Sequence, residues 1–213
     1  MIESLICLKS LLSQIRQVYL EKLGIPTELR SSMKKAFTSI LIIIVTIALV
    51  WALIHFIGMK GFLFAWTLNF LLMACTFTFT ETLKSPLASP YFTDRTWERK
   101  GKIYESVGVN LYRKLLVWTG WEKLNKKANP IEKNNAALTH LHYQTKKSEL
   151  GHLIILIIVL GLNIFVAFKY GVRESLSLLV LNILLNLYPI LLQRYNRPRI
   201  ERAMGLSRRK SGF

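Results

Sequence analysis

Four apolar stretches of nearly membrane length constrain the fold of this chain more than any other feature. A membrane-spanning helix needs about 20 mostly apolar residues, and these stretches come close: Phe37–Ile57, Phe62–Phe79, His152–Phe168 and Ser175–Gln193. The chain is 52% hydrophobic yet has a net charge of +17, and its Lys and Arg residues all lie outside these stretches. Soluble domains seldom combine these two properties. We therefore expect an all-α integral membrane protein with four transmembrane helices.

The loops between the apolar stretches predict how the helices pair and which way they face. Only Gly58–Gly61 separates the first two stretches and only Lys169–Glu174 the last two, so the helices should form two hairpins. Lys and Arg number six before the first stretch, 13 between the second and third, and seven after the fourth, against one and two in the short turns. Because positive residues concentrate on the cytoplasmic side of a membrane, we expect both termini and the central loop in the cytoplasm.

The remaining segments divide the chain into five parts. Residues 1–36 begin with apolar residues spaced by three and four, which predicts an amphipathic helix in the membrane interface. The first hairpin covers 37–80, the second 152–193, and a basic tail 194–213. The central segment 81–151 is too long for a plain connection, so we expect it to form helices at the headgroup level. Its polar part from Asn125 to Asn135 predicts a loop, and Ala136–Gly151 predicts a helix that continues into the third apolar stretch. Its candidate membrane anchors are Trp97, Trp118 and Trp121. We expect the cations of the chain to attract membrane lipids rather than nucleic acid, because no nucleic-acid motif accompanies them.

The end of the central segment carries the first residues suited to chemistry. Spacings of three, four and three place one group on a single helix face: His142, Thr145, Glu149 and His152. Glu149 could orient His152 as a general base; alternatively, Glu149 neutralises a nearby cation such as Lys146, and His152 only marks the interface. Zinc accepts His and Glu as ligands, and His140 would be a further candidate beside His142, Glu149 and His152. However, His140 and His142 point in different directions on a helix, and no metal is predicted.

The end of the last apolar stretch carries a second polar group. Asn186, Pro189 and Gln193 follow at spacings of three and four, so they should line one helix face. Pro189 has no N–H, which frees the carbonyl of Leu185. A dense cluster follows: Arg194, Tyr195, Asn196, Arg197, Arg199 and Arg202. Guanidinium groups bind phosphate and carboxylate well, although the concentration of positive residues on the cytoplasmic side also explains some of these arginines.

Three motifs in the chain resemble those of one known family. They are QRYNRPR from Gln193, TKKSELGH from Thr145, and the looser YFTDRTWERKGKIYESVGVNLYR from Tyr91. Together they are similar to the glycosyl-4,4'-diaponeurosporenoate acyltransferases, a bacterial membrane family that acylates the sugar of a glycosylated carotenoid in staphyloxanthin-type synthesis. The family motif has an acidic residue where this chain has Gln144.

The resemblance implies acyl transfer from acyl-CoA, or a similar donor, to a hydroxyl of a membrane glycolipid or glycosylated carotenoid. The reaction would occur at the cytoplasmic face of the bacterial cell membrane, with acyl-CoA as a co-substrate and no other cofactor. The expected catalytic residues are His152 as base, Glu149 to orient it, and the oxyanion donors Gln193, Arg194 and Asn196. The expected substrate-binding residues are Gln144, Thr145, Asn186, Tyr195, Arg197 and Arg199.

Two alternatives to this mechanism and function follow from the residues. An acyl-enzyme would need an activated nucleophile, and no Ser or Cys has a Gly-x-Ser-x-Gly setting, so direct transfer is preferred. The alternative function is a non-enzymatic protein that binds lipid or acts as a scaffold through its cationic cytoplasmic face. The sequence leaves the number of subunits open.

Overall fold

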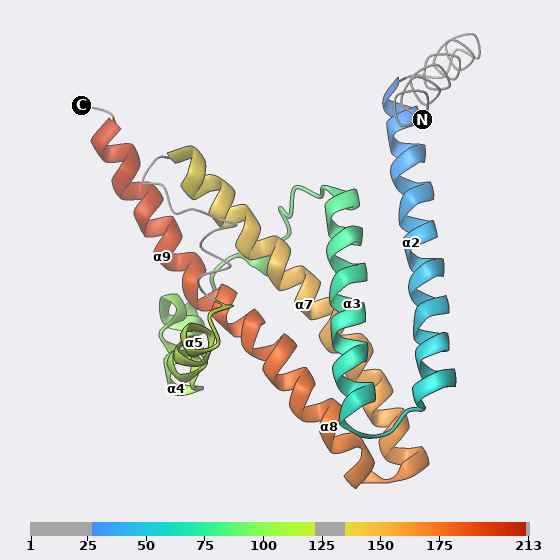
Figure 1. The fold of residues 1–213 in the computed structure, drawn as a ribbon. Coiled ribbons are helices and arrows are strands. Elements are labelled where there is room, and N and C mark those ends of the chain that lie inside the picture. Colours follow the sequence, from blue (N-terminus) through green and yellow to red (C-terminus); the bar gives the residue numbers. More distant parts are fainter. Residues whose placement is uncertain (1–26, 122–134, 212–213) are drawn as a thin grey trace.

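The computed structural model describes residues 27–121 and 135–211, and every regular element within these residues is helical (Figure 1). In this part of the chain, four helical segments are long and apolar enough to cross a membrane. The first three are α2, Thr27–Ile57; α3, Gly61–Leu83; and α7, Asn135–Tyr170. The fourth lies within α8, Val172–Asn182, the π-helical turn η3, Ile183–Leu187, and α9, Tyr188–Ser211. The predicted all-α architecture with four candidate spans is confirmed.

The long helices run alternately up and down (Figure 1). The start of α2, the end of α3, the start of α7 and the end of α9 lie on one side of the molecule. The turn that joins α2 to α3 and the turn at Gly171 lie on the other side. Helix α2 begins at Thr27, so residues 27–36 belong to the same helix as the first apolar stretch. The amphipathic helix expected near the N-terminus lies outside the described residues.

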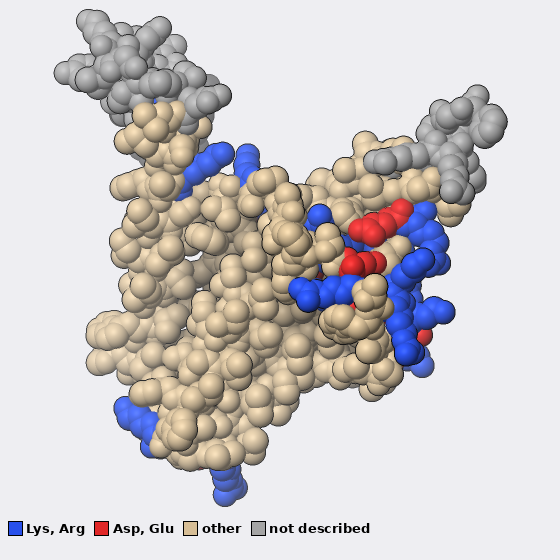
Figure 2. Space-filling view, turned by 180° about the vertical axis from the view of Figure 1, so that it is seen from behind, with Lys and Arg blue, Asp and Glu red and all other residues tan. Residues whose placement is uncertain are grey.

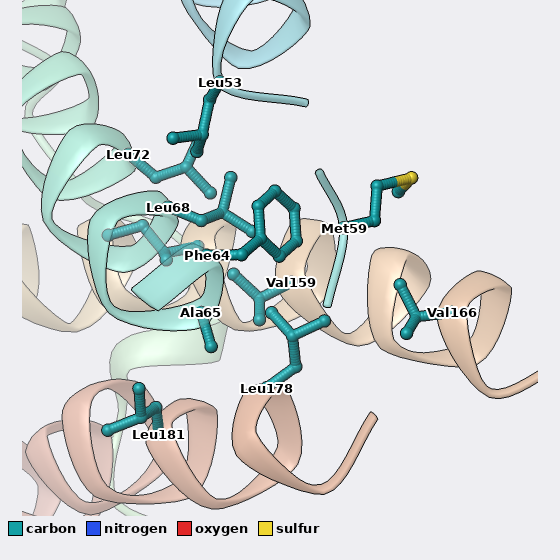
Figure 3. Close-up of a cluster of buried hydrophobic side chains, with 11 residues drawn as sticks. Leu53, Met59, Phe64, Ala65, Leu68, Leu72, Val159, Val166, Leu178 and Leu181 are labelled. Carbon is teal, nitrogen blue, oxygen red and sulfur yellow. The ribbon is translucent and has the colours of Figure 1, made fainter. Parts of the chain in front are cut away.

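Apolar side chains of α2, α3, α7 and α8 form the main core, and Figure 3 shows how they interlock. Phe64 and Leu68 of α3, Val159 of α7 and Leu178 of α8 are almost completely buried. Lipid tails are as apolar as these side chains, so close packing rather than the hydrophobic effect holds such helices together. Helix α2 contributes little to the core, because only 6% of its most apolar window is buried.

The central segment contains short helices that pack on α9. They are η1, Pro90–Phe92; η2, Thr96–Gly101; α4, Ile103–Ser106; and α5, Val109–Trp118. A small second core joins Tyr104 and Val109 to Tyr195 of α9. The expectation of helices in this segment is therefore confirmed between Pro90 and Trp118. The predicted loop around residues 125–135 lies almost entirely outside the described residues.

The last two helical segments are longer than their apolar stretches. Helix α7 begins at Asn135 and continues without a break into the third stretch, as the sequence predicted. Helix α9 continues through the basic tail to Ser211 although Pro198 lies inside it. A proline removes one helical hydrogen bond, and the contacts of α9 with α7 keep the helix intact. The two helices therefore lie against each other beyond the core.

Candidate functional site

One face of α7 meets the last helical segment through four polar residues. Each residue of the predicted group has its partner on η3 or α9. The pairs are His142 with Glu201, Thr145 with Arg197, Glu149 with Arg194 and Arg197, and His152 with Asn186. The prediction that these four residues share one face is confirmed. The two polar groups, one on α7 and one on the last helical segment, therefore lie against each other.

Glu149 is the centre of a buried ion cluster between α7 and α9. Its side chain is fully buried, and its Oε1 accepts a hydrogen bond from Arg194 Nε at 2.7 Å. Its Oε2 accepts a second hydrogen bond from Arg197 Nη2. Burying a carboxylate costs several kcal/mol unless opposite charges and hydrogen bonds compensate. The two guanidinium groups supply both, which explains how a Glu can occupy this position.

The same two arginines hold the central segment against the long helices. Arg194 Nη1 donates to Glu98 Oε1 at 2.5 Å, and Arg194 Nη2 donates to the carbonyl of Tyr91 at 3.0 Å. Arg197 Nη1 donates to the carbonyl of Phe92 at 3.1 Å. Glu98 is only 1% exposed, so the cluster balances two buried carboxylates with two guanidinium groups. Every nitrogen of both guanidinium groups has a partner, and both side chains act as anchors in this structure.

The expected pairing of Glu149 with His152 differs from the contacts that the structure shows. Both carboxylate oxygens of Glu149 bind arginines, whereas His152 lies next to the amide of Asn186. A guanidinium group is permanently charged and binds a carboxylate more strongly than a neutral imidazole does. Glu149 therefore organises the cluster, and Asn186 is the residue that orients His152.

Two asparagines fix the direction of the amide of Asn186. Asn69 Nδ2 donates to the carbonyl of Ala65 at 2.8 Å, and Asn182 Nδ2 donates to the carbonyl of Leu156 at 3.1 Å. A backbone carbonyl can only accept a hydrogen bond, so these contacts determine which atom of each amide is nitrogen. The side-chain oxygens of both residues then face Asn186.

The same logic determines where His152 carries its proton. Asn186 Nδ2 donates to Asn69 Oδ1 at 2.7 Å and to Asn182 Oδ1 at 2.9 Å, which uses both of its hydrogens. Asn186 Oδ1 is left facing His152 Nδ1 at 3.4 Å, and an oxygen requires a donor. The carbonyl of Leu185 is a further acceptor near the imidazole. The amide chain therefore favours the tautomer of His152 with its proton on Nδ1.

The helix around Asn186 has an irregular turn beside the amides. Residues 183–187 form one π-helical turn, and Pro189, which has no N–H, is the second residue of α9. A π-helical turn contains one extra residue, and such turns occur often at functional sites. Here the irregular turn lies beside His152, where Asn182 and Asn186 bond to each other.

The other predicted site residues lie nearer the end of α9 and the start of α7. Gln193 Nε2 donates to Ser148 Oγ at 3.2 Å, so it contacts α7 at the residue directly before Glu149. Asn196 is half-buried on α9. The amide nitrogen of Gln144 lies 3.2 Å from His140 Nε2 at an exposed position on α7.

Tyr195 and Arg199 connect α9 to the short helices. The Tyr195 side chain is buried, and its hydroxyl donates to Asn110 Oδ1 at 3.4 Å. The guanidinium group of Arg199 lies 3.5 Å from the centre of the Tyr195 ring. Arg199 Nη2 also donates to Glu105 Oε1 at 3.0 Å, in a pair that is about 40% exposed on each side. Arg199 is therefore far more accessible than Arg194 or Arg197.

Two residues of the site had no assigned role in the sequence interpretation. Glu98 is the second buried carboxylate of the cluster. The sequence feature that could have identified it is its position as the single acidic residue among the cations of TWERKGK. Asn182 precedes Asn186 by four residues, a spacing that puts both amides on one helix face. Asn69 of α3 contacts the same amides, because its Oδ1 accepts a hydrogen bond from Asn186. Within the described residues, no three His, Cys, Asp or Glu side chains gather as metal ligands.

Comparison with known families assigns this arrangement to a class of enzyme. A family model described as glycosyl-4,4'-diaponeurosporenoate acyltransferase matches residues 88–206, which is more than half of the chain. The chain belongs to this acyltransferase family. Searches among curated proteins and among solved structures found no match.

Membership in the acyltransferase family confirms the resemblance and agrees with the geometry. The match contains the ion cluster and the histidine with its amide partner: Glu98, Glu149, His152, Asn186, Arg194 and Arg197. Asn69 on α3 lies outside it. The reaction class of the family is acyl transfer, and the family name gives a carotenoid as the compound class.

Proposed function

We propose that this acyltransferase moves a fatty acyl group from acyl-CoA or a similar thioester to a hydroxyl of a membrane glycolipid or glycosylated carotenoid. The reaction takes place at the cytoplasmic face of the bacterial cell membrane. The family match supports the reaction class, and the four long apolar segments support a membrane location. In this proposal α2 with α3, and α7 with α8 to α9, are two hairpins with their open ends in the cytoplasm.

The cytoplasmic face suits both substrates. The thioester donor carries charged phosphates and reaches the protein from water, while the acceptor and the acyl chain stay in the bilayer. Moving the charged phosphates of the donor through hydrocarbon would be costly. Along the chain, Lys and Arg concentrate before the first apolar stretch, between the second and third, and after the fourth, as the positive-inside rule requires of cytoplasmic segments.

The observation that carries the proposal is the amide chain behind His152. A proton held on Nδ1 by Asn186 leaves Nε2 as the nitrogen that can accept a proton. His152 is partly exposed, whereas Asn186 is only 2% exposed. An imidazole held in one tautomer in this way is suited to general base catalysis, which typically contributes about 10²–10⁴-fold to a rate.

The proposed reaction is a direct transfer in two steps. The acceptor hydroxyl oxygen attacks the thioester carbonyl carbon while its proton moves to Nε2 of His152. The tetrahedral intermediate then collapses, the carbon–sulfur bond breaks, and the imidazolium returns the proton to the thiolate. The products are an ester and free thiol, and His152 regains its starting state.

Amides on α9 are the candidates for binding the oxyanion. Gln193 and Asn196 are three residues apart and both are partly exposed. One oxyanion donor is worth about 3 kcal/mol in related chemistry. Arg194 is a positioning residue in this proposal, because Glu149 and Glu98 occupy its donors.

The remaining candidates divide between positioning and substrate contact. Arg197 and Thr145 are buried and bonded to each other, so they position α7 against α9. Gln144, which is partly exposed, and Arg199 remain candidates for contact with the substrates. The ring of Tyr195 packs against the guanidinium group of Arg199.

The test is transfer of a labelled acyl group from acyl-CoA into extractable lipid by membranes that contain the protein. Wild type should form product, and His152→Ala should not, at equal amounts of inserted protein. The matched control is His55→Ala, since His55 is exposed on α2 and stacks on Trp51. Mass spectrometry of the product identifies the acceptor. Absence of transfer by wild type across donors and native lipid extracts would overturn the proposal in favour of lipid binding or scaffolding.

A further inference from the structure

Five cationic side chains line an open pocket of about 580 Å³ where η2 and α4 meet α9. They are Arg99, Lys100, Lys102, Arg199 and Arg202. This volume lies within the range of about 300–1,000 Å³ that small-molecule sites occupy. Figure 2 shows Lys and Arg residues gathered along one edge of the molecule.

An unusual backbone turn carries the first cations of the pocket. Arg99, Lys100 and Gly101 have consecutive positive φ angles of 49°, 56° and 85°. Residues with side chains rarely adopt this conformation, and such outliers cluster at functional sites. Both cations of this turn are exposed.

Contacts on both sides of the turn hold it against α9. Glu98, directly before it, is buried and bonded to Arg194. Gly101 approaches α9 so closely that a Cβ atom there would lie 3.1 Å from the carbonyl oxygen of Tyr195. The ion cluster and the glycine contact therefore fix the position of η2 beside the cations of α9.

The charges of the pocket are largely uncompensated. Arg199 is paired with Glu105 and stacked on Tyr195. Across residues 27–121 and 135–211, none of the other four cations has a carboxylate within 4 Å. Placing like charges side by side is unfavourable unless an anion joins them, so the arrangement is suited to a ligand with several negative groups.

We propose that this pocket binds the clustered phosphates of the coenzyme A donor. The inference rests on the proposed function and adds the place where the donor is held. Arg and Lys are the side chains that bind phosphate best. Asn186 and Arg199 are 13 residues apart on α9 and its preceding turn, which corresponds to roughly 20 Å at 1.5 Å per residue. The extended pantetheine arm of coenzyme A can bridge such a span, which brings the thioester toward His152.

The test measures binding of desulfo-coenzyme A to the full-length protein in phosphatidylcholine nanodiscs by calorimetry. This compound has the phosphates of the donor but no thiol, so binding is measured without turnover. The variant Lys102→Gln with Arg202→Gln should bind at least about tenfold more weakly, since each charge-assisted hydrogen bond contributes about that factor. Lys169→Gln with Arg173→Gln removes the same charge near the opposite turn and should bind like wild type.

Several results would overturn the inference. Equal affinities of the two double variants would show that the pocket does not hold the phosphates. Absence of desulfo-coenzyme A binding would also overturn it. In that case, anionic vesicles containing phosphatidylglycerol, and acyl carrier protein, would be tested as ligands that depend on Lys102 and Arg202.

The failure of this inference and the failure of the proposed function are distinguishable. Transfer from another acyl donor, without binding of desulfo-coenzyme A, would leave the proposed function in place and remove the phosphate pocket. Binding that depends on the pocket, without any acyl transfer, would keep the pocket and remove the proposed reaction.

Discussion

Removal of the central carboxylate should destabilise the protein through an unbalanced charge. In Glu149→Gln the buried cluster keeps Arg194, Arg197 and Glu98, so its net charge changes from zero to +1. The glutamine can accept one of the two hydrogen bonds that the carboxylate accepts, but it has no charge. Breaking a buried ion pair by removing one partner typically costs about 3–5 kcal/mol. Because Glu149 is 0% exposed, water cannot easily compensate for the loss.

The corresponding measurement is thermal unfolding of the purified variants in detergent. For a chain of this size, about 3–5 kcal/mol corresponds to a fall in Tm of about 6–20 °C. Glu105→Gln is the matched control, because it removes a carboxylate from an arginine pair that is about 40% exposed. Exposed pairs contribute about 0–1 kcal/mol, so its Tm should change by no more than a few degrees.

A second substitution separates charge balance from simple loss of contacts. Glu149→Gln together with Arg197→Gln restores a net charge of zero in the cluster. The double variant should therefore be more stable than the sum of the two single effects predicts, by about 0.5–3 kcal/mol. A Glu149→Gln protein as stable as Glu105→Gln, or strictly additive effects, would refute the reasoning.

Two further predictions concern the segment that packs on α9. Gly101→Ala should lower stability by about 1–3 kcal/mol in thermal unfolding, because Gly101 has a φ of +85° and a Cβ there would lie 3.1 Å from the carbonyl oxygen of Tyr195. Gly120→Ala is the control, since Gly120 also has a positive φ but lies in open space, and it should cost less. Equal losses of stability in the two variants would contradict the effect of the close approach. Burial, assisted by the charge of Glu98, raises the pKa of Tyr104 to about 12, above about 10 in an unfolded chain. The stability linked to this proton is complete below pH 10 and is lost as pH rises toward 12. Stability should therefore fall more steeply between pH 10 and 12 in wild type than in Tyr104→Phe, and equal slopes would contradict the shift.

The helical architecture was predictable because membrane length and periodicity are local properties of a sequence. The four apolar stretches gave four candidate spans, and the continuity of α7 followed from the helical pattern after Ala136. The continuation of α9 to Ser211 was not predictable from the chain. Pro198 disfavours a helix interior locally, and the contacts with α7 outweigh that local preference.

The site was predictable only as far as one helix determines it. Spacing showed that Glu149 and His152 share a face, but it could not show which residues of α9 meet them. The partners of Glu149 come from positions 45 and 48 residues away, and their position also depends on Glu98 in another segment. The choice of partner therefore depends on tertiary packing. In the structure Glu149 binds two arginines and His152 contacts Asn186, instead of Glu149 and His152 contacting each other.

The rate of acyl transfer by His152→Ala, per mole of inserted protein and relative to wild type, tests the central claim most directly. The two proteins should be compared in the same membranes with the same labelled acyl-CoA. General base catalysis by His152 predicts a fall of about 10²–10⁴-fold with unchanged insertion. A ratio near one would contradict the assignment of His152 as the base and the mechanism that depends on it.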